Sequence, residues 1–550
     1  MANKNILLIE PGYKNKYPPL GLMKLAQYHG TNGKRDNVRF IKGEDRRVIG
    51  TAWDRVYVTT LFSFEWTRTS RAIDFALEVV KGQADRVFVG GIAASLMHEK
   101  FIEENRWRGV RFIKGLLTES PAESLQLDEY EEELYSDDFH GTPIEELVPD
   151  YSILDQIEYK YPVRDAYFMY ASRGCIRTCT FCGVPKLEGG QRDTPSLSAI
   201  VKKIENQYGV KKDLIFMDNN IVASDRFAEI MAEVVDLGFG KGATINKKGL
   251  IIKRRVDFNQ GVDARELYKN PNLMKEIAKI CISPLRIAFD HLGLKKQYES
   301  SIRMAAENGL RELSNYMLYN YQDDPIDLYK RMQLNVVLNE ELNIRIFSFP
   351  MRYQPVDRVD RGFVGNKWTR YQLRSMQVIL QATHGIVSGN PEFFYKAFGS
   401  SPEVFTDLLL RPHHFVFNRF WYEEGPGKPE FEDYTRQFQK LSSIQKEELL
   451  QILSSTIFGE SGGVSSSRSE ISVQFSKITN NILSDILHFY IPLAKDVESK
   501  IWEQQKQFKY GQIEKKLSFN LPEDEVVEDA GLDDELINDI KLEPINNLVK

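Results

Sequence analysis

The sequence predicts an α/β protein with three folded parts. These are a doubly wound sheet at the amino end, a partial (β/α)6 barrel of the TIM type, and a mostly helical carboxyl-terminal part. Short apolar runs alternate with helical stretches from the amino end, at least six further strand–helix pairs follow in series, and strand-like runs stop after Gln354. The 550 residues are too many for one hydrophobic core, so several domains are expected.

The amino-terminal alternation indicates a Rossmann-like domain, placed at residues 1–145. Because ligands of doubly wound sheets bind beyond the carboxyl ends of the strands, the loops after Ile9, Thr60 and Val89 are the predicted rim of a cleft. A docking domain with an empty cleft is the alternative. The predicted strands are Ile6–Ile9, Val38–Ile41, Val56–Thr60 and Val87–Val89, and the predicted helices are Leu20–Tyr28 and Thr69–Lys81.

An acidic stretch from Thr118 to Asp155 predicts an exposed connector. Regular strand–helix alternation then resumes and predicts the barrel over residues 160–355. Helices are expected at Ser196–Gln207 and Asp225–Leu237. The predicted barrel strands are Tyr167–Ala171, Leu214–Met217, Val256–Asn259, Pro284–Phe289, Ser314–Leu318 and Ile344–Phe349.

Residues 356–520 are predicted to form the helical part, with clear helices at Tyr371–Ala382 and Pro402–Leu410. The segment Ser461–Glu470, SGGVSSSRSE, has the composition of a flexible linker, and helices are expected after it at Ile471–Phe489 and Val497–Gln512. Residues 521–550 are expected to be a disordered, solvated tail, since Pro522–Lys550 carries ten acidic and two basic side chains.

The pair His413 and His414 is expected at a helix start or a subunit contact, with a substrate pocket as the less favoured interpretation.

The composition is that of a soluble, folded protein. The net charge of -6 gives no general attraction to phosphate backbones, so nucleic acid is not indicated as a partner. No run approaches the roughly 20 apolar residues of a membrane-spanning helix, and the amino end lacks the core of a signal peptide, so a cytoplasmic location without membrane partners is predicted. Three of the four cysteines lie within eight residues, which indicates a metal site rather than a disulfide framework.

These three cysteines, Cys175, Cys179 and Cys182, have C-x3-C-x2-C spacing directly after a predicted strand. Three thiolates on one short loop can each bind one iron of a cubane cluster, and the fourth iron then stays open for another ligand. Gly174 and Gly183 flank the cysteines and permit a tight backbone. The pattern predicts an iron–sulfur cluster.

A zinc site completed by a histidine is the alternative. The nearest histidines are His140 and His291, and neither belongs to the paired spacing that usually closes a zinc site. Cys281 is isolated at a predicted helix-to-strand boundary and is expected to be a small core residue.

The cysteine spacing, with Phe181 just before the last cysteine, resembles the signature of the radical S-adenosylmethionine superfamily. This resemblance implies a [4Fe–4S] cluster whose open iron binds S-adenosylmethionine. It also implies reductive cleavage to a 5′-deoxyadenosyl radical that acts on an organic substrate, here unidentified. A one-electron reductant such as a flavodoxin or ferredoxin is the implied partner. The resemblance covers about residues 165–355.

Two polar segments at strand ends resemble places where family members contact the cofactor. Capping of the following helix is the alternative for each residue. The first segment, Phe216 to Asn220, lacks the usual glycine pair. The candidates for cofactor contact are Phe181 beside the cluster, Asp218 and Asn219 in the first segment, and Asn259, Gln260, Asp263 and Arg265 in the second.

The segments Tyr17–Leu22, Thr59–Phe62 and Gly90–Ser95 resemble the three loops of cobalamin-binding domains that precede many such barrels. The D-x-H-x-x-G loop of members that bind cobalamin through histidine is absent; His29 precedes Gly30 but lacks the aspartate. We therefore expect an empty or relic domain, with cobalamin held only by its periphery as the alternative.

Two functions from other classes are weighed against the radical enzyme. A non-catalytic iron–sulfur or redox-sensing protein would bind the cluster without cleaving the cofactor. A zinc-knuckle module for nucleic acid would contain zinc and a basic face.

Overall fold

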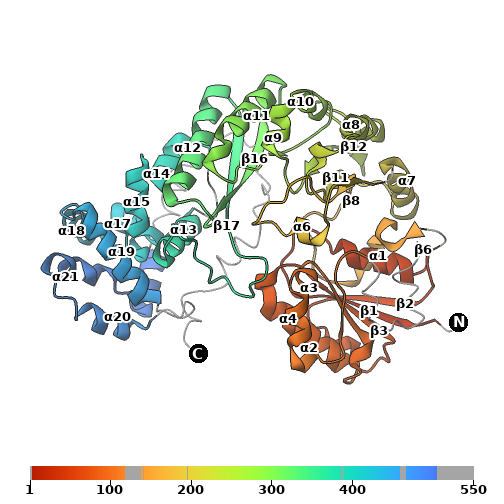
Figure 1. Cartoon of the computed structure of the whole chain (residues 1–550), viewed down its shortest axis with the longest axis horizontal. Coiled ribbons are helices and arrows are strands. Elements are labelled where there is room, and N and C mark those ends of the chain that lie inside the picture. Colours follow the sequence, from red (N-terminus) through yellow and green to blue (C-terminus); the bar gives the residue numbers. More distant parts are fainter. Residues whose placement is uncertain are drawn as a thin grey trace. The chain divides into compact units, whose positions relative to one another are not determined.

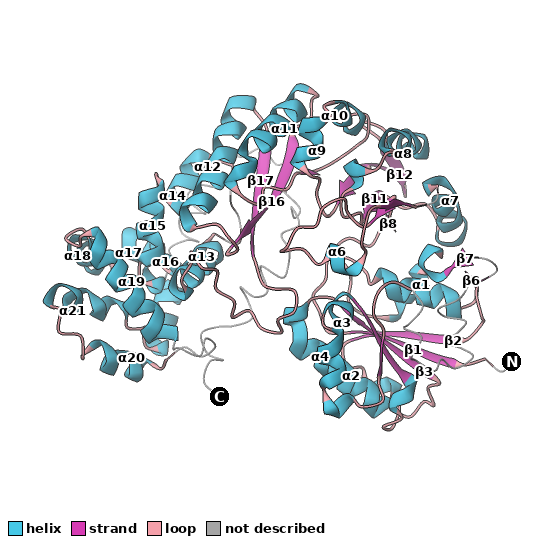
Figure 2. Cartoon of the chain, viewed as in Figure 1, coloured by secondary structure: helices cyan, strands magenta, loops and turns pink. Residues whose placement is uncertain are grey.

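The structure is a computed structural model that describes residues 3–117, 138–139, 142–194, 196–383, 385, 387, 389–458 and 466–504. It is mixed α/β, with parallel sheets and many helices, as predicted (Figure 2). Packing divides the chain into two units. The first contains Met1–Phe289, Leu294–Tyr316 and Tyr353–Phe363, and the second contains Asp290–Gly293, Met317–Arg352 and Val364–Lys550. The division does not follow the predicted domain bounds, which stay a prediction.

The amino-terminal sheet has five parallel strands in the order β2-β1-β3-β4-β5 (Figure 1). Ile6 of β1, the second strand in this order, pairs with Val38 of β2 and with Arg55 of β3. The order reverses between β1 and β3, which is where a doubly wound sheet opens its ligand crevice. The elements are β1 (Asn5–Glu10), α1 (Leu20–His29), β2 (Asn37–Lys42), β3 (Arg55–Thr60), α2 (Trp66–Val79), β4 (Val87–Gly91), α3 (Ile92–Leu96), α4 (His98–Glu103) and β5 (Arg111–Phe112).

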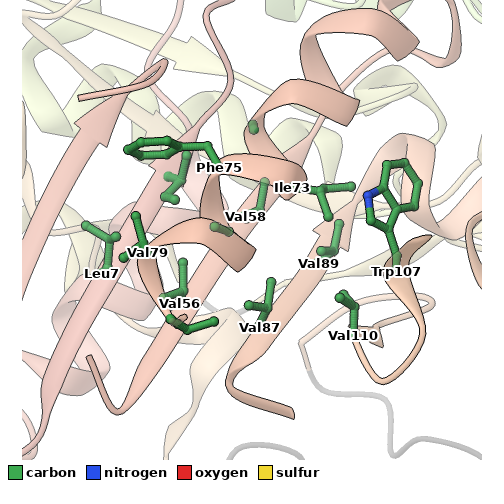
Figure 3. Packing of buried hydrophobic residues seen from close by; sticks show 14 of the residues in the cluster. Leu7, Val56, Val58, Ile73, Phe75, Val79, Val87, Val89, Trp107 and Val110 are labelled. Carbon is green, nitrogen blue, oxygen red and sulfur yellow. The ribbon is translucent and has the colours of Figure 1, made fainter. Parts of the chain in front are cut away.

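A cluster of buried side chains holds this sheet against α2. Leu7, Val58 and Val89 come from three neighbouring strands, and Ile73 and Phe75 of α2 belong to the same cluster (Figure 3). Burying one such side chain stabilises the fold by about 1.5–3 kcal/mol. The strands are apolar on both faces because helices cover both, which explains the continuous apolar runs of the sequence.

A second parallel sheet, β14-β11-β8, also belongs to the first unit. Leu214 of β11 pairs with Tyr167 of β8 and with Val256 of β14. Parallel bridges from Val256 to Ile282 and from Val262 to Ile287 continue the pairing toward β15. The elements are β8 (Ala166–Met169), α7 (Leu197–Tyr208), β11 (Asp213–Phe216), α8 (Phe227–Val234), β14 (Val256–Phe258), α9 (Ala264–Lys269), α10 (Asn272–Ile277) and α11 (Lys295–Glu307).

The next sheet has the order β15-β16-β17, and Leu285 of β15 pairs in parallel with Leu313 of β16. Its strands and following helix are β15 (Leu285–Arg286), β16 (Glu312–Tyr319), α12 (Pro325–Leu342) and β17 (Arg345–Arg352). The strand–helix succession therefore continues as predicted, although β15 is shorter than the predicted Pro284–Phe289.

One hairpin was not predicted. Strands β12 (Thr244–Lys247) and β13 (Leu250–Lys253) pair antiparallel, and Lys248 and Gly249 turn the chain at φ 51° and 84°. Leu250 and Ile251 are 67% and 78% exposed. Because neither packs into a core, the apolar and polar residues of this segment do not alternate as they do in a half-buried strand.

Four short strands complete the described sheets. The pairs β6 with β7 and β9 with β10 are antiparallel. Their bounds are β6 (Asp138–Phe139), β7 (Thr142–Pro143), β9 (Ser172–Arg173) and β10 (Arg192–Asp193), and the helix between β9 and β10 is α6 (Val184–Leu187). Most of the predicted acidic connector, including His140, lies outside the described residues.

The second unit ends in the predicted helical part. Phe415, Tyr434, Leu453 and Phe489 belong to its buried core. No described helix has both the length and the apolar character needed to cross a membrane. The helices are α13 (Arg370–Ala382), α14 (Pro391–Phe398), α15 (Pro402–Leu410), α16 (His413–Phe417), α17 (Arg419–Glu423), α18 (Lys428–Phe438), α19 (Ser443–Phe458), α20 (Arg468–Phe475) and α21 (Asn481–Leu487).

The linker prediction for Ser461–Glu470 is wrong at its carboxyl end. Helix α20 begins at Arg468, because Ser467 and Glu470 form a reciprocal capping box with the first turn. The predicted helix Ile471–Phe489 is interrupted between α20 and α21. Residues 459–465 and the predicted acidic tail lie outside the described residues.

Candidate functional site

The three clustered cysteines lie on the loop between β9 and α6, and each is partly exposed. The amide of Cys182 donates to the carbonyl of Cys179 at 3.0 Å, which closes a turn. Two backbone amides point at sulfur: Arg177 N lies 3.4 Å from Cys175 Sγ and Val184 N lies 3.4 Å from Cys182 Sγ. Amide donors of this kind stabilise thiolates and tune iron–sulfur clusters.

A tight bend at Gly174 begins the loop. Gly174 has φ +75°, and a Cβ there would lie 2.3 Å from the carbonyl oxygen of Gly190. Its amide donates to Glu188 at 2.9 Å, and the amide of Cys175 donates to Gly189 O at 3.3 Å. Only glycine fits here, because the loop folds back against its own far end.

Asp218, a predicted cofactor contact, is 3% exposed, and its carboxylate faces the segment that leads into the cysteines. It accepts hydrogen bonds from Ala171 N at 3.0 Å, Ser172 N at 2.5 Å and Ser172 Oγ at 2.8 Å. Burial raises the pKa of Asp218 to about 7 despite these donors. The position supports the cysteine loop, a role that the sequence did not indicate, and cofactor contact by Asp218 stays a prediction.

Three buried amide atoms near the loop have no hydrogen-bond partner in the described structure: Asn219 Nδ2, Asn220 Oδ1 and Gln191 Oε1. Asn220 Nδ2 lies 3.8 Å from Cys175 Sγ, and Gln191 Nε2 donates to Ser172 Oγ and to Asn220 O, each at 3.2 Å. Buried polar groups without partners are rare and indicate a missing ligand or water. The two acceptors suit an ammonium group and the donor suits a carboxylate, so the set fits the end of an amino acid.

Of these three residues, only Asn219 was a predicted contact. Gln191 lies on a loop without periodicity, and no local pattern distinguishes it.

The second predicted segment meets the cysteine loop through Arg177. Arg177 Nε lies 3.0 Å from Asp263, and its guanidinium also pairs with Glu266. Asp263 caps α9 and accepts from Arg265 N at 2.9 Å and Arg265 Nε at 2.7 Å. Burial alone raises the pKa of Asp263, but the hydrogen bonds from Arg265 and Arg177 outweigh it and hold the pKa below its usual value. Helix capping, the alternative for this aspartate, is therefore observed.

The remaining predicted contacts are placed as follows. Asn259 accepts a hydrogen bond from Tyr316 Oη at its carbonyl, 2.9 Å away, Gln260 is exposed, and Phe181 is partly buried beside Cys182. Roles for Phe181, Asn259, Gln260 and Arg265 at a cofactor stay predictions.

Within the described ranges, no three side chains of His, Cys, Asp or Glu gather closely enough to hold a single metal ion. Three thiolates that each bind a different iron of a cubane are spread farther apart than three ligands of one ion. The three thiolates are the kind of donor that an iron–sulfur cluster takes from a protein, one for each of three irons. Cys281 lies elsewhere; burial raises the pKa of its thiol to about 11, but its side chain is partly exposed rather than part of the fully buried core.

A buried charge network connects the cysteine loop to α1. Arg173 lies 3.0 Å from Glu145 and 3.1 Å from Glu188, and Glu145 lies 3.1 Å from Lys24 of α1. The Arg173 guanidinium also stacks 3.9 Å above the ring of Tyr170. Two positive and two negative charges balance one another at low exposure, so the network ties the loop to the amino-terminal sheet domain. Figure 1 also shows α6 beside α3, where Leu96 approaches Gly183.

Buried side chains of the chain itself lie at the carboxyl end of β1, on the edge of the sheet where the crevice was predicted. Tyr13 follows β1, is 1% exposed, and bonds through its hydroxyl to Thr69 of α2. Glu10, at the end of β1, is fully buried; it pairs with Lys42 at 2.6 Å and accepts from the hydroxyl of Tyr161. The predicted rim loops are therefore present, and buried side chains pack beside the loop that follows β1.

Two candidate histidine positions are structural. His29 is fully buried between Asp36, 2.9 Å away, and the hydroxyl of Tyr57, 3.1 Å away, and burial lowers its pKa. His413 stacks on Tyr371 with ring centroids 4.5 Å apart and bonds to Ser375 Oγ at 3.1 Å. Both agree with the favoured expectation for each residue.

Comparisons with known proteins were made for the whole chain. No protein-family model matches it. It is 22% identical over 211 residues to the ribosomal protein uS12 methylthiotransferase RimO of Christiangramia forsetii, covering 36% of this chain and 41% of that protein. The chain thus spans about two fifths of the length of this relative.

Solved structures that resemble this chain include a radical S-adenosylmethionine methyltransferase, TsrM, from Kitasatospora setae with cobalamin and a [4Fe–4S] cluster bound. The TM-score is 0.42 at 14% identity, covering 65% of this chain and 77% of that one. SuiB of Streptococcus suis bound to S-adenosylmethionine matches with a TM-score of 0.25 at 14% identity, covering 40% and 47% of the two chains. One of these solved structures, TsrM, is described as a radical S-adenosylmethionine methyltransferase, and the cysteine motif of this chain resembles the signature of that superfamily.

Proposed function

We propose that the chain is a radical S-adenosylmethionine enzyme. The thiolates of Cys175, Cys179 and Cys182 would hold a [4Fe–4S] cluster and leave one iron open. The C-x3-C-x2-C loop, with backbone amides directed at two of its sulfurs, carries this proposal. When bound, the cluster supplies the electron that cleaves S-adenosylmethionine to a 5′-deoxyadenosyl radical, which takes hydrogen from an unidentified organic substrate.

The unpartnered amides beside the loop would bind the methionine end of the cofactor. Gln191 Oε1 and Asn220 Oδ1 would accept from its ammonium group, and Asn219 Nδ2 would donate to its carboxylate. Asp218 would hold the loop in place beneath them. The segment from Asn259 to Arg265 would contribute the ribose and carboxylate contacts predicted from the sequence.

The predicted partial barrel would consist of six strands, β8, β11, β14, β15, β16 and β17. The substrate would bind at the carboxyl ends of these strands, the mouth of the barrel. Such a mouth excludes water. A carbon radical requires that exclusion. A flavodoxin or ferredoxin in the cytoplasm would deliver the electron.

The amino-terminal domain would bind no cobalamin in its crevice. The space near the end of β1 contains Tyr13 and the cluster of Glu10, Lys42 and Tyr161. Both ring nitrogens of His29 have hydrogen-bond partners, Asp36 and the hydroxyl of Tyr57. Mixing the purified protein with cobalamin, removing unbound ligand and recording a visible spectrum tests this. A retained corrinoid band would contradict it.

The decisive experiment is purification and cluster reconstitution without oxygen, followed by reduction in the presence of S-adenosylmethionine. We expect a brown protein with about four irons per chain that releases 5′-deoxyadenosine. Cys175→Ala, Cys179→Ala and Cys182→Ala should each lose iron and product together. Cys281→Ala is the matched control and should keep both.

Other outcomes would select the other functions. A stable cluster without release of 5′-deoxyadenosine would indicate a redox-sensing protein. Zinc in place of iron would indicate a zinc-knuckle module and overturn the proposal.

A further inference from the structure

The sulfur of Cys175 has a side-chain donor in addition to the amide of Arg177. Asn220 Nδ2 lies 3.8 Å from Cys175 Sγ, 45 residues away in sequence. Asn220 is 3% exposed, so this N–H group points at sulfur in a region with little water. A dipole of this kind acts more strongly there than in solvent, because the local dielectric constant is low.

The backbone of Asn220 is held independently of its side chain. Its carbonyl accepts from Gln191 Nε2 at 3.2 Å and from the amide of Ala223 at 3.1 Å. The other polar atom of its side-chain amide, Oδ1, has no partner among the described residues. The amide side chain therefore contributes no other hydrogen bond to the described fold, and its removal leaves the local backbone contacts in place.

We propose that Asn220 is a positioning residue that raises the reduction potential of the cluster by donating a hydrogen bond to the Cys175 sulfur. The inference rests on the proposed function, because it requires a cluster on the three cysteines. Reduction adds one negative charge to the cluster and its thiolates. An N–H donor stabilises the reduced form more than the oxidised form, so its loss makes reduction harder.

The test compares Asn220→Leu and Asn220→Asp with the wild-type chain, each reconstituted without S-adenosylmethionine. Leucine has a similar size but no donor, and aspartate adds a negative charge beside the sulfur. Redox titration followed by EPR should give midpoint potentials that fall in the order wild type, leucine variant, aspartate variant. Asn272→Leu, at an exposed asparagine that begins α10, is the control and should keep the wild-type potential.

A leucine variant with full iron content and an unchanged midpoint potential would overturn this inference and leave the proposed function intact. A wild-type chain that binds no iron would instead overturn the proposed function. If both Asn220 variants lose iron, wild-type protein with 15N-labelled asparagine side chains decides the question by pulsed EPR. A 15N coupling to the reduced cluster supports the hydrogen bond, and its absence overturns it.

Discussion

Asp218 shows how one carboxylate can organise the entry to the cysteine loop. Its two oxygens accept from two consecutive backbone amides, Ala171 and Ser172, and from the hydroxyl of Ser172. The residue was predicted as a cofactor contact because its segment, at a strand end, resembles the place where members of the radical S-adenosylmethionine superfamily contact the cofactor. The strand end was correctly predicted, but the direction of the carboxylate depends on the neighbouring strand β8 and the turn that follows it.

Asp218→Asn is expected to destabilise the protein by about 1–3 kcal/mol, since an amide NH2 would replace one acceptor opposite buried donors. Iron loading should fall as well, because the loop loses its support. Thermal unfolding and iron analysis measure the two effects. Asp236→Asn, at an exposed position of the same βα unit, should change neither. Wild-type stability and iron in the Asp218 variant would refute the structural role.

Gly174 and Gly189 allow backbone strain and steric overlap to be separated. Both have positive φ, +75° and +72°, but a Cβ at Gly174 would overlap Gly190 O, whereas a Cβ at Gly189 meets open space. Gly189→Ala should cost about 1–2 kcal/mol through its φ alone. Gly174→Ala should cost more and should lower iron binding. Equal unfolding midpoints for the two variants would contradict the close packing of the loop.

At the scale of the element, helix α16 contains a pair of partly buried imidazoles. Burial lowers the pKa of His413 to about 3, with Arg374 and His414 adding to the effect, and burial lowers the pKa of His414 to about 4. Both are neutral in the folded chain, whereas the unfolded chain protonates them below the usual value of 6.5. The unfolded state therefore binds more protons, and stability is lost as the pH falls.

The free energy of unfolding should decrease below pH 6.5, by up to about 1.4 kcal/mol per pH unit for each histidine, until the folded pKa values are reached. His414→Phe keeps an aromatic ring against Phe415 and Tyr422 and should reduce this slope. His488→Gln, at an exposed histidine, is the control and should leave the slope unchanged. Denaturant unfolding between pH 4 and 8 provides the measurement. If the pH dependence of the free energy of unfolding were unchanged in the His414 variant, His414 would not have a lowered pKa in the folded chain.

The elements themselves differ in how well the sequence predicts them. Segments with clear apolar runs or helical periodicity lie where expected, such as Pro402–Leu410, which is helix α15. The hairpin of β12 and β13 was missed because its apolar residues are exposed and follow no burial pattern. The linker prediction failed at Ser467, since a serine-rich composition there conceals a capping box.

At the scale of the whole molecule, the Lys24–Glu145–Arg173 network joins the amino-terminal sheet domain to the cysteine loop. Lys24→Met should destabilise the chain by about 1–3 kcal/mol, because the partly buried Glu145 loses one of the two cations it pairs with. Iron loading should decline in parallel if the network positions the loop. Lys269→Met, an exposed lysine of α9, is the control. Normal iron content in the Lys24 variant, measured with thermal unfolding, would limit the network to a role in stability.

The sequence by itself determined the strands and helices that have clear apolar periodicity, and the three clustered cysteines, because apolar periodicity and the spacing of thiols on one loop are local properties of the chain. The tertiary structure alone decided the strand order β2-β1-β3-β4-β5, the burial of Tyr13 against Thr69, and the approach of Gln191 and Asn220 to the cysteine loop. These features depend on contacts between side chains that are far apart in sequence. Such contacts follow from the packing of several elements together, which no short window of sequence encodes.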